Sequence, residues 1–513
     1  MTVPARAPSL RRRWDRFLLA AEGRLDGGHA DRVLPWAAAG LLFTVLLALD
    51  AAAIRSLDGG SGLAPWLQAA WRRQHGGDGA PVGGVDPATG TWSVVSEPIL
   101  WLTRFVPAEA VFSVVQAAAI ALAIVPLWRL ARQEAHLRVG ATAVLAAAFA
   151  VAPTLHRANL GAFHPELIAL PALPWAYLHA RQGHWKRYAA LVLLVLSCRA
   201  DLGLTVAALG VLLVSIGRRW PGLITAAVGL AHSIVAVIVI DPSTPDRALT
   251  PAGEFVARST TPLAVFPRLV IHPVVEAREL LAEPSVLFLV VVLAPLLFLP
   301  LVAPRMLMVA MPCLVLAMIA DRSVQRVAQD GVLDLSPAAA HIGPAVAFVF
   351  VALIFALERV GDRSETRVTV DRRVLVALLA GATLLFVTEA PSSPYRRPWS
   401  WGSQDAVDGA RLEAADLIGD DDAVAASPTT TALVAERADL VELPPDPDDL
   451  TTTRLAVLAA STDWVLLDAS LVDVRTGEPQ WSPEAVDAFV ARMADRGFEP
   501  VYEAQRIHLL RRT

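Results

Sequence analysis

Arg199 and Asp201 are the charged residues whose surroundings most strongly suggest chemistry. They lie between the apolar runs 188–198 and 202–217, with only Ala200 separating them. Ionisable side chains at membrane depth are costly, and they usually face the protein interior or a water-filled cavity. The pattern therefore predicts either a polar site that is reached through a cavity or a buried ion pair that joins two helices.

A second polar cluster is predicted at the same level of the membrane. Arg157 lies at the end of one apolar run, and His164 and Glu166 lie at the start of the next. Pro165 suits the first turn of a helix, and the helix dipole stabilises a carboxylate there, so helix-start chemistry also explains these residues. Beside Arg199, this set could hold a phosphate and transfer protons. A divalent metal ion is the other ligand considered, although one histidine and two carboxylates are a sparse ligand set.

The composition is that of a membrane protein with many spans. Of the 513 residues, 55% are hydrophobic and 18% are charged, and the mean hydropathy is +0.50. Apolar runs recur from Val33 to Val387, whereas residues 391–513 have the composition of a soluble domain. Cys198 and Cys313 both lie in apolar runs, so no disulfide framework is expected. No basic stretch typical of nucleic-acid binding is present in the sequence.

We expect eleven transmembrane segments in residues 33–390, after a cytoplasmic N-terminal segment 1–32. The segments are 33–54, 108–128, 139–155, 165–180, 188–198, 202–217, 222–240, 285–302, 305–320, 343–358 and 374–390. Arginine and lysine in short loops mark the cytoplasmic side. These residues are Arg129, Arg132, Arg138, Arg181, Lys186, Arg187, Arg218, Arg219 and the arginines from Arg359 to Arg373. The tail 391–513 is then outside the cytoplasmic membrane, as is the first outer loop, 55–107.

The segment 188–217 has two interpretations. One helix over these 30 residues would be about 45 Å long, and it would place Lys186 and Arg218 on opposite sides of the membrane. Two short helices joined at 199–201 keep both residues on the same side. We favour the hairpin and expect the helix to break at Gly203.

The first outer loop is long enough to carry function. Its stretch 62–71 predicts an amphipathic helix, with Trp66 and Trp71 at the level of the lipid headgroups. Asp58 precedes this helix, and Glu97 precedes the next apolar stretch.

Three further polar residues are singled out in the apolar part of the chain. Asp50 and His232 are lone polar residues within apolar segments, and we interpret both as interior side chains. His341 comes before the tenth segment, and from the sequence alone it is an ordinary loop histidine.

The tail has the pattern of a small α/β domain. A helix is expected at 405–418, and another begins with Ser482 as N-cap and ends at Gly497. Short strands are expected at 423–426, 440–443 and 464–467, followed by a closing strand pair at 500–505 and 506–511. The tail contains no phosphate-binding glycine loop and no nucleophile motif.

Several of these stretches resemble a bacterial multi-pass membrane family of unknown function. They are Trp66-Leu-Gln-Ala-Ala-Trp71, Phe163-His-Pro-Glu166, Arg199-Ala-Asp-Leu-Gly203, Asp463-Trp-Val-Leu-Leu-Asp468 and Arg506-Ile-His-Leu-Leu510. That family is distantly similar to the GT-C glycosyltransferases, which use polyprenyl-phosphate sugar donors. The resemblance covers most of the chain. It implies a GT-C-like helical domain with a large cavity that opens to the outer leaflet.

The chain departs from the family pattern where the resemblance implies chemistry. The usual acidic position of the first outer loop is Gly62, a usual histidine is Val95, and one carboxylate of a triplet is Ala200. Asp58 or Glu97 would then supply the missing carboxylate.

The polar residues expected together at the outer face, taken with the resemblance, give seven residues of this chain an expected role. Arg199, supported by Arg157, would bind the donor phosphate, and His164 and His341 would orient groups. Glu166, Asp201 or Asp58 would act as catalytic base or metal ligand.

The sequence thus predicts an α-helical polytopic protein of the cytoplasmic membrane with a small extracytoplasmic α/β domain. The predicted function is transfer of a sugar from a polyprenyl-phosphate carrier at the outer face, with membrane lipid as a partner. The alternative is a non-catalytic lipid- or glycolipid-binding protein, or a transporter, that retains the fold.

Overall fold

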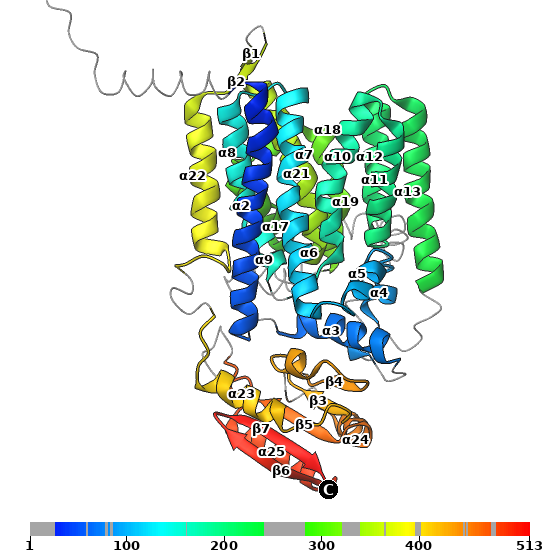
Figure 1. Cartoon of the computed structure of the whole chain (residues 1–513), viewed down its shortest axis with the longest axis vertical. Coiled ribbons are helices and arrows are strands. Elements are labelled where there is room, and N and C mark those ends of the chain that lie inside the picture. The colour runs from blue at the N-terminus through cyan, green and yellow to red at the C-terminus, as the bar shows by residue number, and fades with distance from the viewer. Residues whose placement is uncertain are drawn as a thin grey trace, which may run out of the picture.

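The computed structural model describes most of the chain. The described residues are 26–57, 60–76, 81–82, 86–160, 162–240, 283–320, 339–363, 366–395, 402–444, 447, 450–472 and 479–513. Helices form one elongated body, and a smaller α/β body lies against one end of it (Figure 1). We call this end the tail end.

The helical body is built from helices of very different lengths. They are α2 (Gly28–Arg55), α6 (Ala108–Leu122), α7 (Ile124–Arg129), η2 (Leu130–Glu134), α8 (Val139–Ala150), α9 (Pro153–Asn159), η3 (Pro165–Ile168), α10 (Ala169–Gln182), α11 (Trp185–Cys198), α12 (Leu202–Ser215), α13 (Arg219–Ile240), α17 (Glu283–Leu293), η6 (Ala294–Leu296), η7 (Leu299–Val302), α18 (Pro304–Leu307), α19 (Met311–Ala320), α21 (Ala339–Val360) and α22 (Arg372–Glu389). A short β1–β2 pair (Asp362–Arg363, Val368–Thr369) joins the last two helices. Three short helices of the outer loop, α3 (Gly60–His75), α4 (Pro87–Gly90) and α5 (Ser96–Leu102), lie at the tail end (Figure 1).

Within the described residues, three helical stretches are long and apolar enough to cross a membrane. They are Gly28–Arg55, Ala108–Glu134 and Ile342–Val360, and the pair α8–α9, bent by 45°, would be a fourth. The protein is therefore a mostly helical membrane protein, and the count of eleven segments stays a prediction.

Helices α11 and α12 form the expected hairpin. The Arg218 guanidinium, beyond the end of α12, lies 5.8 Å from the ring centre of Trp185 at the start of α11. It also donates a hydrogen bond of 3.3 Å to the Arg181 carbonyl. Both basic clusters therefore lie at one end of the body, opposite the tail end, and we call it the basic end. A single long helix over 188–217 is excluded by these contacts.

The break lies at Arg199, and the expectation of a break at Gly203 was wrong. The backbone of Arg199 is extended, with φ −165° and ψ 152°, whereas Gly203 lies inside α12. Gly203 instead permits close packing, because a Cβ there would meet the backbone of Gly229 and the side chain of Ser233 on α13. Small residues serve this purpose between membrane helices.

The strands and the two helices expected in the tail are all present, and α24 (Thr452–Ser461) and the turn η8 (Thr431–Val434) are additional. Its sheet has the order β4-β3-β5-β7-β6, in which β3 (Val424–Ala426), β4 (Leu440–Glu442) and β5 (Trp464–Asp468) are parallel and β6 (Phe498–Ala504) and β7 (Ile507–Arg512) are antiparallel. Helices α23 (Ala406–Asp416), α24 and α25 (Pro483–Ala494) and the turn η8 complete it. Ser482 caps α25, since its hydroxyl accepts from the Ala485 N–H at 3.2 Å.

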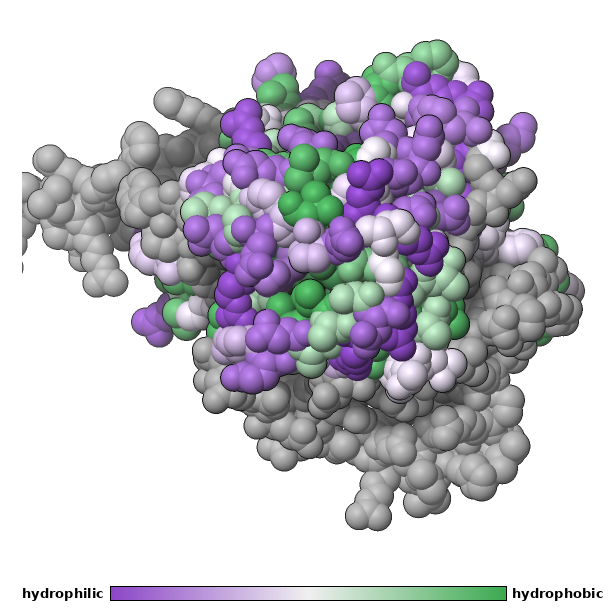
Figure 2. All heavy atoms as spheres, turned by 90° about the horizontal axis from the view of Figure 1, so that it is seen from below, coloured by the Kyte–Doolittle hydropathy of each residue, from purple (hydrophilic) through white to green (hydrophobic). Residues whose placement is uncertain are grey.

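The tail and the outer loop share one hydrophobic core. Trp66 on α3 is buried in it together with Phe112, Phe163 and Val434, so the expectation that Trp66 lies at headgroup level was wrong. The Gln68 amide reinforces this joint, because its Nε2 donates to the carbonyl of Ala438 at 3.0 Å. The opposite face of the tail is mostly hydrophilic (Figure 2), as expected for a surface in water.

The α12–α13 packing makes a first prediction. A Cβ on Gly210 would lie 2.6 Å from the Gly222 carbonyl oxygen, whereas one on Gly40 of α2 meets nothing within 4 Å. Gly210→Ala should therefore cost about 1–3 kcal/mol through overpacking and lower the thermal unfolding midpoint of the purified protein in detergent. Gly40→Ala is the matched control and should leave the midpoint unchanged or higher. Equal midpoints for the two variants would contradict the packing.

Candidate functional site

The turn between α11 and α12 carries a compact charged cluster. Arg199 binds Asp201 through both ends of its guanidinium, with Nε 2.5 Å from Oδ1 and Nη2 2.8 Å from Oδ2. Its Nη1 lies 3.2 Å from Oε1 of Glu166, and the same oxygen lies 3.2 Å from Nδ1 of His164. We call these four residues the Arg199 cluster. The structure thus brings together four of the seven residues singled out in the sequence.

The loop that carries His164 is held in place by α6. Pro165 begins η3 as expected, and Glu166 lies in its first turn. The Gln116 side chain on α6 accepts from the His164 backbone N–H at 2.7 Å and donates to the carbonyls of Asn159 and Ala162 at 3.1 and 3.0 Å. Since Gln116 is buried, these bonds fix the position of His164 relative to the bundle.

The Arg199 turn is closed on its outer side by residues 91–95, which we call the strap. The Ala200 N–H donates to the Thr91 carbonyl at 3.2 Å, and the Val95 N–H donates to the Ser197 carbonyl at 3.0 Å. Trp92 has a φ of +56° and packs against Ala200. A non-glycine residue in this conformation stores about 1–3 kcal/mol of strain.

The cluster is buried and densely paired. Arg199 is 5% exposed, Glu166 3% and Asp201 1%. Burying a charge is expensive unless it is paired and hydrogen-bonded, which explains the two-pronged contact with Asp201. The expected open polar cavity around these residues is not what the structure has, because the strap covers the turn. Two small pockets in the described structure are lined by other residues.

The remaining predicted site residues are placed differently. Arg157 donates to the Glu389 carbonyl at 3.1 Å, so this contact ties it to the end of α22 and not to the Arg199 cluster. His341 falls in the first turn of α21, and its side chain lies outside the described part. Asp58 lies outside the described residues altogether.

Glu97 is engaged within the outer loop. Arg73 binds Glu97 at 2.7 Å and Asp86 at 2.9 Å, and Asp86 also accepts from the Ala88 and Thr89 N–H groups as the N-cap of α4. Burial alone would raise the pKa of Asp86, but the hydrogen bond and charge of Arg73 outweigh it and lower that pKa. This network shapes the loop, and it leaves Glu97 paired with a cation.

Asp50 is an interior side chain, as the sequence predicted. It is 8% exposed and lines a cavity of about 20 Å³ together with Ser113, Gln116 and Phe163, enough for about one water-sized group. No described basic side chain forms an ion pair with it.

A metal ion does not fit the arrangement of the cluster. The guanidinium of Arg199 lies against both Glu166 and Asp201, where a divalent ion would have to bind. Within the described residues, no group of three or more His, Cys, Asp and Glu side chains could hold a metal.

Comparison with known proteins gives the family. The family described as "Predicted membrane protein (DUF2079)" matches residues 94–503, in agreement with the family predicted from the sequence. No curated protein matches the chain. The solved structures that are similar to this chain include the following two. The arabinofuranosyltransferase AftD from Mycobacteria has a TM-score of 0.47 and 13% identity over 92% of this chain and 39% of its own. The Archaeoglobus fulgidus oligosaccharyltransferase has a TM-score of 0.35 and 14% identity over 84% and 69%. This chain thus spans well under half the length of AftD.

The charge balance of the cluster makes a second prediction. Arg199→Gln leaves two buried carboxylates without their cation, which should destabilise the protein by about 3–5 kcal/mol. Adding Glu166→Gln and Asp201→Asn removes those charges and should restore most of the lost stability. Thermal or denaturant unfolding of the purified variants measures both effects. A triple variant no more stable than Arg199→Gln would show that the charges are not coupled.

Proposed function

The chain belongs to the DUF2079 family of predicted membrane proteins, and on that premise we propose that it is a membrane glycosyltransferase of the GT-C type. The proposed reaction transfers a sugar from a polyprenyl-phosphate carrier at the outer face of the cytoplasmic membrane. The observation that carries the proposal is the Arg199 cluster, in which one guanidinium contacts two carboxylates and an imidazole lies beside one of them. The sequence resemblance supplies the reaction class.

In this proposal, Glu166 is the proton acceptor and Arg199 binds the donor phosphate. The acceptor hydroxyl oxygen forms a bond to the anomeric carbon of the sugar as the bond from that carbon to the phosphate oxygen breaks. The hydroxyl proton passes to the Glu166 carboxylate. The negative charge left on the phosphate is stabilised by Arg199. His164, 3.2 Å from Glu166, orients the carboxylate.

The remaining predicted residues keep supporting roles in the proposal. Asp201 and Asp58 are the other carboxylates that could act as base, Arg157 adds a second cation for the phosphate, and His341 orients a substrate group. The lipid carrier would be drawn from the outer leaflet, at the end of the body where the tail lies.

Substrate entry requires the strap to open. Arg199 is occupied by Asp201, so a phosphate must take the place of at least one carboxylate contact. Only two backbone hydrogen bonds join the strap to residues 197–200 among the described contacts. Release of the strained backbone of Trp92 would offset part of their loss.

The test is binding of a polyprenyl phosphate to the purified full-length protein in lipid nanodiscs. Arg199→Lys keeps the charge but loses the bidentate geometry, and it should weaken binding about tenfold or more, about 1.4 kcal/mol. Arg73→Lys makes the same change in the outer-loop ion pair and is the matched control, with affinity expected to stay unchanged. Equal affinities of the wild type and Arg199→Lys for the polyprenyl phosphate would contradict the proposal.

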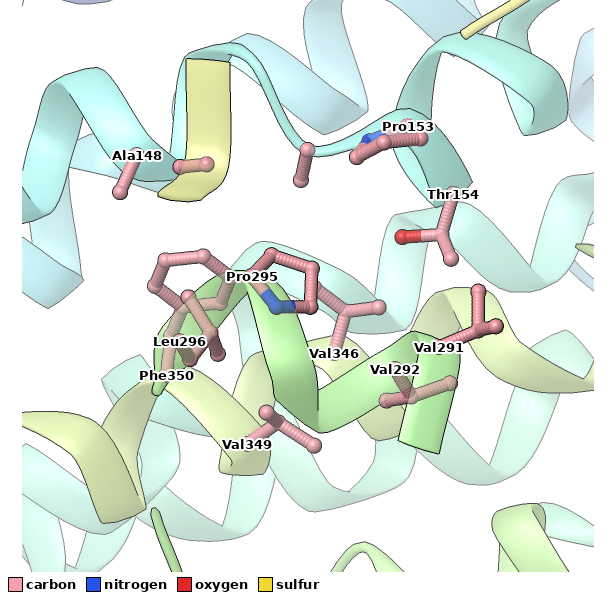
Figure 3. A pocket seen from close by; sticks show the side chains of 12 residues that line it. Ala148, Pro153, Thr154, Val291, Val292, Pro295, Leu296, Val346, Val349 and Phe350 are labelled. Carbon is pink, nitrogen blue, oxygen red and sulfur yellow. The ribbon is translucent and has the colours of Figure 1, made fainter. Parts of the chain in front are cut away.

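The closed state of the cluster favours a second candidate, a non-catalytic lipid-binding protein. A hydrocarbon chain would bind in an apolar pocket between several helices (Figure 3). The pocket lies where α8 meets α9 and α17 meets η6, beside α21 and α22. Its lining includes Ala148, Pro153, Val291, Pro295, Val346 and Phe350. The space is only about 30 Å³, so its walls would have to part for a chain. Turnover of a labelled prenyl-linked sugar by the purified protein would exclude this candidate.

A further inference from the structure

The basic end carries a cluster of aromatic and basic side chains that the proposed function does not use. The Arg129 guanidinium of α7 lies 4.9 Å from the ring centre of Trp175 on α10. His179 stacks on the same indole at 5.4 Å with an interplanar angle of 19°, and His184 lies 5.6 Å from His179. We call this group, with Arg187 of α11, the Trp175 cluster.

No ion pair between this cluster and a carboxylate is found among the described residues. Arg187 lies in the first turn of α11, three residues after His184, and adds its charge at the same end of the body. Two carboxylates at this end are engaged with other arginines. Glu134 accepts from Arg181 at 3.0 Å, and Glu358 faces Arg363 at 3.7 Å.

The His179 ring has one enclosed nitrogen. Its Nδ1 is shielded from solvent and has no hydrogen-bond partner among the described residues. A ligand from outside would reach this nitrogen only after the ring turns. The exposed side chains of His184 and Arg187 are the ones open to a ligand.

We propose that the Trp175 cluster binds the phosphate of an anionic phospholipid headgroup. Arginines bind phosphate oxygens through charge-assisted hydrogen bonds, and basic pockets between membrane helices on the cytoplasmic side hold anionic headgroups. Tryptophan is typical of the membrane–water interface, which favours a lipid over a free phosphate. Trp175 provides the apolar wall, and Arg129 and Arg187 provide the charge. The site is independent of the Arg199 cluster, which lies at the tail end.

The geometry explains why this site differs from other basic residues at the same end. Arg219 and Arg373 are also exposed there, but no aromatic contact is recorded for either side chain in the described structure. They attract an anionic membrane at long range, but they do not form a defined binding site for a headgroup. Arg129, by contrast, lies over the indole of Trp175, and His179 stacks on the same indole.

The test compares two double variants with the same net charge. Purified full-length protein is titrated with phosphatidylglycerol and, separately, with phosphatidylcholine, and bound lipid is counted by native mass spectrometry. Arg129→Gln with Arg187→Gln should lower phosphatidylglycerol affinity about thirtyfold, the loss expected when two charge-assisted contacts to a phosphate are removed. Arg219→Gln with Arg373→Gln is the control and should change it by less than about threefold, because exposed charges without a defined partner contribute little and are screened by salt.

Each result decides the proposal. A selective loss in the first variant, with phosphatidylcholine binding unchanged in both, supports it. Equal losses in the two variants would mean general surface attraction and overturn it. Displacement of the lipid by inorganic phosphate at similar concentration would mean a free-anion site, and that too would overturn it. Thermal midpoints of both variants, measured in the same detergent, establish that they are folded.

Discussion

The two-pronged contact between Arg199 and Asp201, extended to Glu166, is the interaction on which the arrangement of the helical body depends. Removing such charges from water costs several kcal/mol per ion, which is recovered only when their geometry is well fixed. Three separate features supply that geometry. Ser233 on α13 donates to the Ala200 carbonyl at 3.1 Å, Gln116 fixes the loop before Glu166, and the strap closes the turn. The close glycine packing of α12 on α13 makes the first of these possible.

A continuous series of contacts connects the tail to this cluster. The tail backbone accepts from Gln68 on α3, and two positions earlier on the same helix Trp66 lies 5.1 Å from Phe163, ring centre to ring centre. Phe163 immediately precedes His164, whose ring contacts Glu166. These contacts connect the tail, through α3 and Phe163, to the loop that carries Glu166.

Features encoded by local patterns could be predicted from the sequence. The hairpin at 199–201, the helix start at Pro165 and the strands of the tail all follow from short-range hydropathy and turn residues. Long-range contacts could not be predicted in this way. The burial of Trp66 depends on the tail, and the bond from Arg157 to Glu389 joins distant segments. Gly203 is an example. The sequence alone does not show whether this glycine breaks a helix or allows a neighbouring helix to pack closely.

The number of carboxylates in the cluster bears on its purpose. An ion pair that only holds the α11–α12 turn in place needs no more than Arg199 and Asp201, because the guanidinium and the carboxylate already form two hydrogen bonds. Glu166 adds a second buried negative charge, which burial disfavours and a single arginine neutralises only in part. A neutral glutamine would serve a purely structural role at lower cost. The extra carboxylate, with an imidazole beside it, is the part of the cluster that the proposed proton transfer would use.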